Sequence, residues 1–215
     1  IPPESYWPEL SRLLEGREVL LIADEVICGF GRTGTMWGST TYGLTPDLMT
    51  IAKGMTGGYL PAGGLMVSDR VAEPVIEHAG EVFHGYTWAA HPAACAAGLA
   101  TLRIMREERL VERVSETLAP KLAALWAGLA DHPLVGEART QGLLGALEIV
   151  ADETTLARFP AEAEAGTRAR DLAAAHGLVM RAVGDTLVVS PPYVITEAEL
   201  EELARRARAT LDALA

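Results

Sequence analysis

The sequence predicts an α/β fold in its first half and an α+β fold in its second half. Two short apolar runs, residues 19–23 and 48–52, are typical of strands covered on both faces of a parallel sheet. Strand-like and helix-like stretches alternate from the start of the chain to about residue 110. Beyond that point, short strands lie among alanine-rich helices. We therefore predict two domains, residues 1–110 and 111–215.

The first predicted domain opens with a helix, because apolar residues recur on one face over residues 4–15 and Gly16 ends the pattern. The two apolar runs follow as strands, separated by a glycine-rich loop over residues 25–46. A loop of this length inside a compact domain is usually functional. The remaining predicted elements are a strand at 63–67, a short helix at 70–78 and a long helix from Pro92 to about Arg106.

The second predicted domain combines helices with short strands. A helix is expected over residues 109–129, broken early by Pro120. Thr196 and Glu199 have the spacing of a capping box at the start of the last helix. The other expected elements are a strand at 142–150, a helix at 161–175 and short strands at 178–181 and 186–190.

Composition and charge exclude several classes of function. The formal net charge of −11 argues against a nucleic-acid backbone or an anionic membrane as the main partner. No apolar stretch is long enough to span a bilayer. Cys28 and Cys95 are the only cysteines, and no cluster has zinc-ligand spacing, so no metal site is expected. Two thiols do not form a disulfide framework, which makes the cytoplasm the expected location.

The segment Gly29–Gly34 matches the pattern G-x-G-x-x-G after a strand, which is the fingerprint of dinucleotide sites. That fingerprint must open a helix whose N-terminus holds the pyrophosphate. The residues that follow include Trp37-Gly38 and Thr45-Pro46, which cannot belong to one regular helix. A nucleotide-dependent oxidoreductase is therefore the weakest of the alternatives.

Two chemically useful side chains end the first two predicted strands, Asp24 after one apolar run and Lys53 after the next. Partly desolvated surroundings favour the neutral amine of a lysine, which attacks carbonyl groups. A carboxylate nearby can hold a protonated ring nitrogen. Pyridoxal 5′-phosphate requires these two roles, a Schiff-base lysine and an acid on the pyridinium nitrogen. Either residue alone is more often a solvated surface residue, but the joint pattern favours this cofactor.

Further short motifs surround these two residues. They are Leu20–Val26, Gly29–Gly34, Pro46–Leu48, Ile51–Gly54, Gly85–Thr87 and His91-Pro92. Together they resemble the class III pyridoxal-phosphate-dependent aminotransferases, over essentially the whole chain and most specifically in the first 100 residues. The resemblance implies an α/β fold of the fold type I transferases. Residues 1–110 would be the C-terminal part of the large, mixed-sheet, cofactor-binding domain, and residues 111–215 the small α+β C-terminal domain.

The resemblance implies a role for each matching residue. Lys53 forms the Schiff base with the cofactor, Asp24 binds its pyridine nitrogen and Val26 packs against one face of its ring. Thr87 donates to the cofactor phosphate in the neighbouring subunit's site, so the minimal active unit is a homodimer with shared active sites. Core packing alone is the alternative for Val26, and a loop or cap hydroxyl is the alternative for Thr87.

Motifs near the C-terminus resemble one branch of this family, the ω-amino acid or amine:pyruvate aminotransferases. They are Gly177–Arg181, Gly184-Asp185 and Ser190–Pro192. In that branch the arginine matching Arg181 receives the substrate carboxylate, which a planar guanidinium binds through two hydrogen bonds. A surface arginine at a strand end is the alternative. The implied reaction transfers an amino group from an ω-amino acid or amine to a keto acid such as pyruvate.

Two features predict that the chain is part of a longer protein. It begins Ile1-Pro2-Pro3 without an initiator methionine, and it lacks the glycine–serine phosphate loop of the family. Alone, it is therefore expected to bind the cofactor weakly. A cofactor-dependent aminomutase or racemase on the same scaffold, and a non-catalytic remnant without the upstream half, stay open as alternatives.

Overall fold

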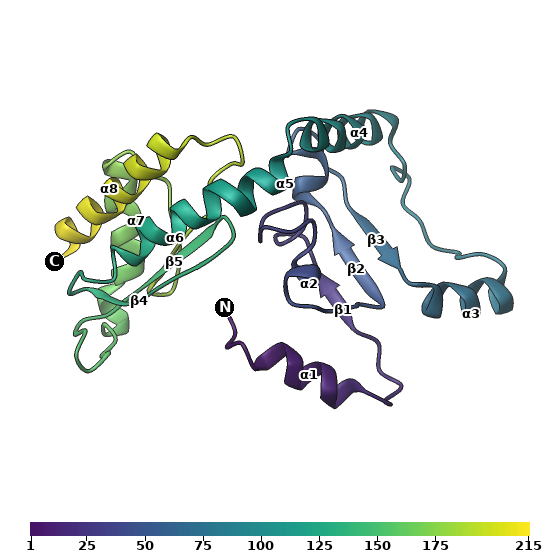
Figure 1. Cartoon of the computed structure of the whole chain (residues 1–215), viewed down its shortest axis with the longest axis horizontal. Coiled ribbons are helices and arrows are strands. Elements are labelled where there is room, and N and C mark those ends of the chain that lie inside the picture. Colours follow the sequence, from purple (N-terminus) through teal and green to yellow (C-terminus); the bar gives the residue numbers. More distant parts are fainter. The chain divides into compact units, whose positions relative to one another are not determined.

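The computed structural model describes residues 1–215, and the chain divides into two compact units, Pro2–Glu112 and Arg113–Ala215. Each unit has its own sheet and its own helices (Figure 1). None of the helices is both long and apolar enough to cross a bilayer. That the first unit is part of a larger cofactor-binding domain stays a prediction.

The first unit contains a three-stranded mixed sheet. Its strands are β1 (Ile22–Asp24), β2 (Leu48–Ile51) and β3 (Gly64–Val67), in that spatial order. β1 and β2 are parallel, with Asp24 opposite Thr50, whereas β3 runs antiparallel to β2. Such a parallel pair needs a crossover connection, which the long segment between β1 and β2 provides. The helices are α1 (Tyr6–Leu14), α2 (Gly38–Thr41), α3 (Asp69–Ala79) and α4 (Pro92–Glu107), and a short 3-10 helix, η1 (Lys53–Thr56), follows β2.

The first strand is shorter and less buried than its apolar run predicts. β1 begins at Ile22 rather than Val19, and Ile22 is 60% exposed. The Leu21 N–H donates to Asp47 Oδ2 at 2.9 Å. The Leu21 carbonyl accepts from the Asp47 N–H at 2.8 Å and from the Leu48 N–H at 3.2 Å. All four residues of β3 are exposed. The expected burial on both faces is therefore wrong for residues 19–23 within this unit, where Val19, Leu20 and Ile22 are exposed, whereas all four residues of β2 are half-buried.

The second unit contains a four-stranded antiparallel sheet with the spatial order β4-β5-β7-β6. The strands are β4 (Val135–Gln141), β5 (Leu144–Ile149), β6 (Arg181–Val183) and β7 (Thr186–Val189). The sequence patterns do not predict β4, because Glu137 and Arg139 interrupt its apolar residues. On β5, half-buried and buried residues alternate, as expected for a sheet with one face in the core.

Three helices form the core of the second unit with this sheet. They are α6 (Ala119–Ala127), α7 (Ala165–Ala175) and α8 (Glu197–Leu214). α6 packs on β4, α7 packs on β6 and β7, and both helices pack on α8. Trp126 is fully buried, and its indole N–H donates to the Ala146 carbonyl at 3.1 Å, which satisfies its polar atom. The other large, fully buried apolar residues are Val114, Leu118, Leu122, Leu143, Leu147, Ile149, Leu187, Leu200 and Leu211.

The predicted break at Pro120 does not occur. α5 (Leu110–Arg113), a π-helical turn η2 (Val114–Leu118) and α6 follow one another without a gap. Proline has no N–H and its ring crowds the preceding turn, so a regular α-helical turn cannot be kept there. The wider π turn directly before α6 accommodates the proline while the helical path continues.

Two further boundaries in the second unit differ from prediction. The expected helix at 161–175 is divided at Glu164, whose φ of 44° lies in the left-handed region, into η3 (Ala161–Ala163) and α7. The strand expected at 178–181 begins at Arg181, and Leu178 and Met180 before it are buried in the core. The apolar residues Leu178 and Met180 therefore pack in the core and do not pair in the sheet.

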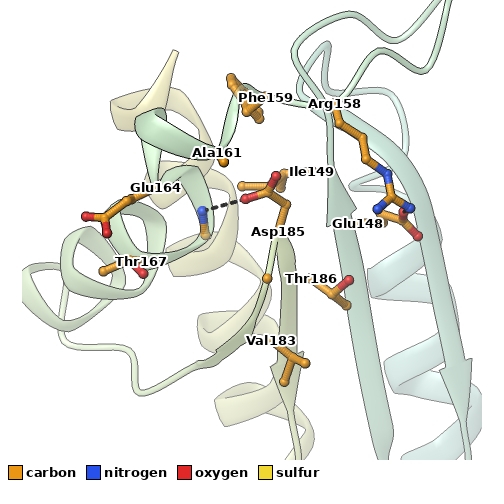
Figure 2. A pocket seen from close by; sticks show the side chains of 12 residues that line it. Glu148, Ile149, Arg158, Phe159, Ala161, Glu164, Thr167, Val183, Asp185 and Thr186 are labelled. Atoms are coloured by element: carbon orange, nitrogen blue, oxygen red, sulfur yellow. Dashed lines mark hydrogen bonds and ion pairs between the residues drawn. The ribbon is translucent and has the colours of Figure 1, made fainter.

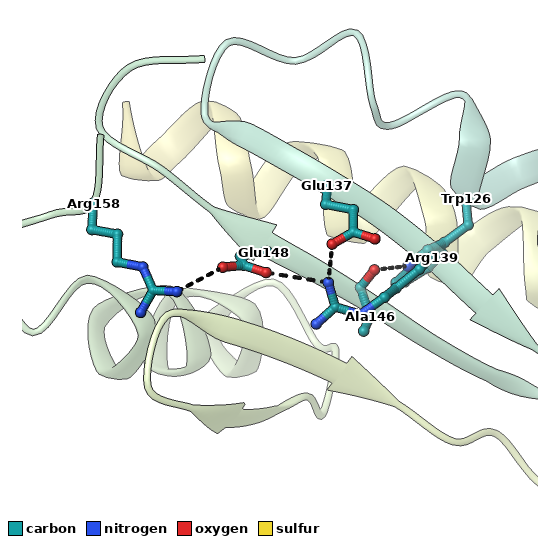
Figure 3. A network of polar contacts seen from close by, with 6 residues as sticks. All are labelled: Trp126, Glu137, Arg139, Ala146, Glu148 and Arg158. Carbon is teal, nitrogen blue, oxygen red and sulfur yellow. Dashed lines mark hydrogen bonds and ion pairs between the residues drawn. The ribbon is translucent and has the colours of Figure 1, made fainter. Parts of the chain in front are cut away.

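Ion pairs connect β4, β5 and the segment before α7 (Figure 3). Glu148 on β5 accepts from Arg139 on β4 at 3.2 Å and from Arg158 at 3.4 Å. Arg139 also pairs with Glu137. Ion pairs that solvent still reaches, as here, contribute about 0–1 kcal/mol each. Through these pairs, the two charged residues Glu137 and Arg139 can lie within the strand β4.

Helix α8 begins with the predicted capping box, which is confirmed. Thr196 Oγ1 accepts from the Glu199 N–H at 3.2 Å, and Glu199 Oε2 accepts from the Thr196 N–H at 2.8 Å. The hydrogen bonds from Thr196 lower the pKa of Glu199. Two N–H groups at the start of the helix are thereby satisfied.

Substituting Thr196→Ala is expected to lower the free energy of unfolding by about 1 kcal/mol, because it removes this N-cap acceptor. The pKa of Glu199 is lower in the folded state, so the contribution of the box is present above the unfolded value of about 4.3 and is lost as the pH falls through the folded value. Urea unfolding at several pH values measures both effects, with Thr167→Ala on the exposed face of α7 as the control. A difference from wild type that does not shrink at acidic pH contradicts the ionic part of the box.

Candidate active site

Asp24 and Lys53 leave the sheet of the first unit at the same edge. Asp24 is the last residue of β1, and Lys53 follows the end of β2 as the first residue of η1. Because β1 and β2 are parallel neighbours, their carboxyl ends lie side by side. Open α/β sheets bind ligands at this edge. The structure therefore brings the two predicted reactive residues to one edge of one sheet.

Asp24 is held by two hydrogen bonds that both use Oδ1. This oxygen accepts from Thr50 Oγ1 at 3.0 Å and from the Val26 N–H at 3.1 Å. Oδ2 makes no hydrogen bond within the chain, and the side chain is exposed. One carboxylate oxygen is thus fixed, while the other is free to accept a hydrogen bond from a protonated ring nitrogen. A side chain on β2 orients the acid on β1.

The chain has two lysines, and their surroundings differ. Lys121 on α6 donates to Glu201 Oε1 at 2.5 Å, and this hydrogen bond raises the pKa of Lys121. Its non-nucleophilic ammonium form is therefore favoured. Lys53 makes no ion pair within the chain and is exposed. The expected partial desolvation of Lys53 is not provided by residues 2–112, because η1 packs on α4 while Lys53 itself stays uncovered.

The glycine-rich segment joins the two strands without forming a nucleotide cradle. Residues 26–37 form turns and bends, and α2 after them is only four residues long. The backbone is left-handed at Phe30, Gly31 and Gly34, with φ of 60°, 99° and 96°. A dinucleotide fingerprint requires a regular helix directly after its glycine turn. The segment therefore lacks the helix that a dinucleotide site requires, in agreement with the sequence, which makes such a site the weakest alternative.

Glu25 is a buried carboxylate to which the sequence patterns give no role. It is 2% exposed, and it accepts from the Ser39 N–H at 2.6 Å and from the Gly38 N–H at 2.8 Å. Its own N–H donates to the Thr50 carbonyl at 3.0 Å. Glu25 thus ties the residues after Asp24 to the start of α2. Because its partners lie 13 and 14 residues further along the chain, no short-range pattern reveals it.

The other predicted site residues lie on separate elements. Val26 is half-buried and lies two residues after Asp24, the last residue of β1. Thr87 lies in the exposed segment between α3 and α4, and its hydroxyl has no partner within the chain. Arg181 is the exposed first residue of β6 in the second unit. The first unit therefore places Val26 next to Asp24, whereas Arg181 belongs to the other unit.

A cavity of about 160 Å³ lies beside Asp24 and includes Trp7, Cys28 and Tyr42 in its lining. Burial, and secondarily the carboxylates of Glu25 and Asp24, raise the pKa of the Cys28 thiol. The nucleophilic thiolate is therefore disfavoured at neutral pH. This agrees with Cys28 acting as a small apolar packing residue.

A second cavity, of about 470 Å³, lies in the second unit between β5, the β6–β7 turn and α7 (Figure 2). Two of the carboxylates that line it, those of Asp185 and Glu148, have partners within the chain. Asp185 Oδ1 accepts from the Gly166 N–H at 3.0 Å, and Glu148 pairs with Arg158. None of the predicted site residues lines this cavity, and we assign it no catalytic role.

Comparison with protein families identifies the scaffold on which Asp24 and Lys53 lie. The sequence profile of the family described as Aminotransferase class-III matches residues 1–211. The chain belongs to the class III aminotransferases. The predicted resemblance to this family is thereby confirmed, although the match by itself assigns no role to a single residue.

Similar class III aminotransferases include a putrescine–pyruvate aminotransferase of Pseudomonas aeruginosa. It is 49% identical over 212 residues, which are 99% of this chain and 46% of the relative. A diaminobutyrate–2-oxoglutarate transaminase of Halomonas elongata is 43% identical over 95% of this chain and 45% of the relative. The chain spans about half the length of these curated relatives.

Solved structures of transaminases have the same fold. A thermostable omega transaminase from Pseudomonas jessenii matches with a TM-score of 0.94 at 36% identity, over 100% of this chain and 48% of that one. A structure described as a transaminase with L-ala matches with a TM-score of 0.92 at 34% identity, over 99% of this chain and 51% of that one. The predicted fold class is confirmed. The roles of Lys53, Asp24, Val26, Thr87 and Arg181 stay predictions.

Proposed function

We propose that this chain forms part of a pyridoxal-phosphate-dependent aminotransferase that moves an amino group from an amine or ω-amino acid to a keto acid such as pyruvate. The observation that carries the proposal is the pairing of Asp24 and Lys53 at the carboxyl ends of two parallel strands. The 49% identity to a putrescine–pyruvate aminotransferase supports the choice of an amine donor and of pyruvate.

The donor set at this edge fits pyridoxal phosphate. Asp24 presents a free, exposed Oδ2 on a carboxylate whose other oxygen is fixed by Thr50 and Val26. A charge-assisted hydrogen bond from Oδ2 to a protonated pyridine nitrogen contributes about 1.5–3 kcal/mol. Lys53 has no competing partner within the chain. When bound, the cofactor would supply an aldehyde that takes up the amino group and a ring that accepts electrons from the carbon that carries that group.

Lys53 has two tasks in this proposal. Its Nζ would hold the cofactor covalently until the substrate amine binds. The same Nζ would then take the proton from the carbon that carries the substrate amino group and return it as a general acid–base group. Asp24 would keep the proton on the ring nitrogen, and Val26 would limit the movement of the ring by packing.

The experiment that tests this function gives the full-length protein an amine, pyruvate and pyridoxal phosphate, and measures alanine. We expect one alanine formed for each amine consumed, and without a keto acid no amine consumption beyond one equivalent of enzyme-bound cofactor. An aminomutase or racemase needs no external keto acid, so conversion of the amino substrate in its absence would favour that alternative. No reaction with or without the keto acid would favour the non-catalytic remnant.

Arg181 is proposed to bind the substrate carboxylate, because its guanidinium is exposed and has no ion-pair partner within the chain. Substituting Arg181→Ala should lower kcat/KM for ω-amino acids by about 10-fold or more, which corresponds to one charge-assisted hydrogen bond. Amines without a carboxylate should be nearly unaffected. Steady-state kinetics with matched pairs of an amine and an ω-amino acid measure the difference, and Arg170→Ala on α7 is the control. An equal loss for both substrate types contradicts the role.

We also propose a cytoplasmic homodimer with shared active sites, in which Thr87 donates to the cofactor phosphate of the partner. Large apolar side chains around Thr87 support a covered position, since Phe83 is 88% exposed and Trp88 is 76% exposed in the single chain. Free thiols at Cys28 and Cys95 support the cytoplasmic location.

Sedimentation of the full-length protein gives the oligomeric state. Mixed dimers of Thr87→Ala and Lys53→Ala subunits should regain activity only if each site uses one residue from each chain.

A further inference from the structure

Phe30 packs directly against the turn that carries Lys53. A Cβ placed on Gly54 would lie 2.9 Å from Phe30 Cβ, 3.1 Å from Cδ2 and 3.2 Å from Cγ. Only a residue without a side chain therefore lets the Lys53-Gly54 turn lie against the phenyl group. Gly54 does not have a left-handed φ, so the need for glycine there is steric and not conformational.

The position of Phe30 is itself fixed by its contact with Trp37. Phe30 is 3% exposed, its φ is 60°, and its ring meets the ring of Trp37 edge to face at 5.1 Å between centroids. Trp37 in turn lies close to Gly29, where a Cβ would come within 3.2 Å of its ring. Glu25 holds the next two residues, Gly38 and Ser39, through its buried carboxylate. A continuous set of contacts thus runs from Glu25 through Trp37 and Phe30 to Gly54.

Lys53 needs such support, because its backbone is strained. Its φ is 40°, in the left-handed region that lysine rarely adopts. A conformation of this kind persists only when the surrounding structure determines it. η1 packs on α4 on one side, and Phe30 lies against Gly54. Without the phenyl group the turn could relax, and Nζ would then move away from the edge where Asp24 lies.

We propose that Phe30 is a positioning residue for Lys53, and that the glycine-rich segment Gly29–Gly34 exists to place it there. The inference rests on the proposed function, because it concerns the lysine that would hold the cofactor. It gives a role to a motif that neither a nucleotide site nor the predicted cofactor contacts explain. The glycines allow left-handed backbone and close approaches within the loop. Phe30, the aromatic residue of the segment, packs against Gly54 in the turn that carries Lys53.

The test measures how fast pyridoxal phosphate becomes attached to the full-length apoprotein. Attachment is followed by the visible absorption of the lysine-bound cofactor. The bond is then reduced with borohydride, which delivers hydride to the carbon of the C=N bond while water protonates the nitrogen. The labelled peptide is identified by mass spectrometry.

Two variants disturb the contact between Phe30 and Gly54 from opposite sides, Phe30→Ala and Gly54→Ala. Met105→Ala on α4, also a large buried residue of the first unit, and Gly128→Ala, where an added Cβ meets nothing closer than 3.4 Å, are the controls.

We expect both Phe30→Ala and Gly54→Ala to slow attachment to Lys53 by about 10-fold or more, because a displacement near 1 Å can cost about 100-fold in rate. kcat should fall further than KM rises, and Phe30→Leu should recover part of the loss. The two controls should attach the cofactor at the wild-type rate.

The outcomes separate the two proposals. Absence of label on Lys53 in the wild type overturns the proposed function itself. Label on Lys53 at an unchanged rate in both Phe30→Ala and Gly54→Ala overturns only the positioning role. An equal slowing in Met105→Ala also overturns it, since the effect would then follow general destabilisation of the unit.

Discussion

Replacing Lys53 by alanine is expected to abolish amino-group transfer by the full-length protein, with a loss of at least about 10⁴-fold in kcat. The reason is that the proposed function gives one side chain two tasks, holding the cofactor covalently and moving the substrate proton, and alanine can do neither. Lys121→Ala is the matched control because Lys121 is the other lysine of the chain and is committed to Glu201. Alanine formation from pyruvate measures the activity, and visible absorption measures cofactor attachment.

The variant Lys53→Gly adds a measurement that separates catalysis from folding. Both Lys53→Ala and Lys53→Gly should be inactive. Glycine accepts the φ of 40° without strain, so Lys53→Gly should be about 1 kcal/mol more stable than Lys53→Ala. Thermal unfolding of the two apoproteins gives the difference. Transaminase activity above background in either variant would refute the assignment of Lys53, and equal stability would contradict the strain.

The strand ends that carry Asp24 and Lys53 could be predicted from the sequence, because they depend on local patterns. An apolar run that ends in Asp24 and another that ends in Lys53 define two strands, and parallel strands have their carboxyl ends at one edge. The capping box at Thr196 is equally local. In these places, residue type and spacing within a few positions decide the structure.

Contacts between distant segments could not be predicted in the same way. Glu25 looks like an ordinary charged residue after a strand, and only the folded loop shows that it accepts from Gly38 and Ser39. The contact between Phe30 and Gly54 joins residues on different elements. The apolar run at β1 predicts more burial than the structure has, for a related reason. An apolar run shows that a segment is suited to burial, but it does not show which part of the chain covers it.

A second large effect is expected from Gly166→Ala, at the start of α7. A Cβ on Gly166 would lie 1.9 Å from the Gly184 carbonyl oxygen and 2.9 Å from its carbonyl carbon. These are backbone atoms of the β6–β7 turn, so no flexible side chain can move aside. We expect the free energy of unfolding to fall by about 3 kcal/mol or more, at the upper end for overpacking. Urea unfolding, followed by tryptophan fluorescence from the buried Trp126, measures it.

Two comparisons show whether overlap with the turn causes this loss. Asp185→Ala removes the acceptor of the Gly166 N–H without adding volume, so it should cost about 1 kcal/mol. Gly128→Ala makes the same substitution at a helix end where φ is −69° and space is available, and should leave the stability unchanged or slightly higher. Because the β6–β7 turn directly follows the strand that carries Arg181, any folded Gly166→Ala protein should also lose activity toward ω-amino acids more than toward amines. Wild-type stability of Gly166→Ala would mean that α7 and the β6–β7 turn are further apart than this structure places them, and Arg181 would then need another support.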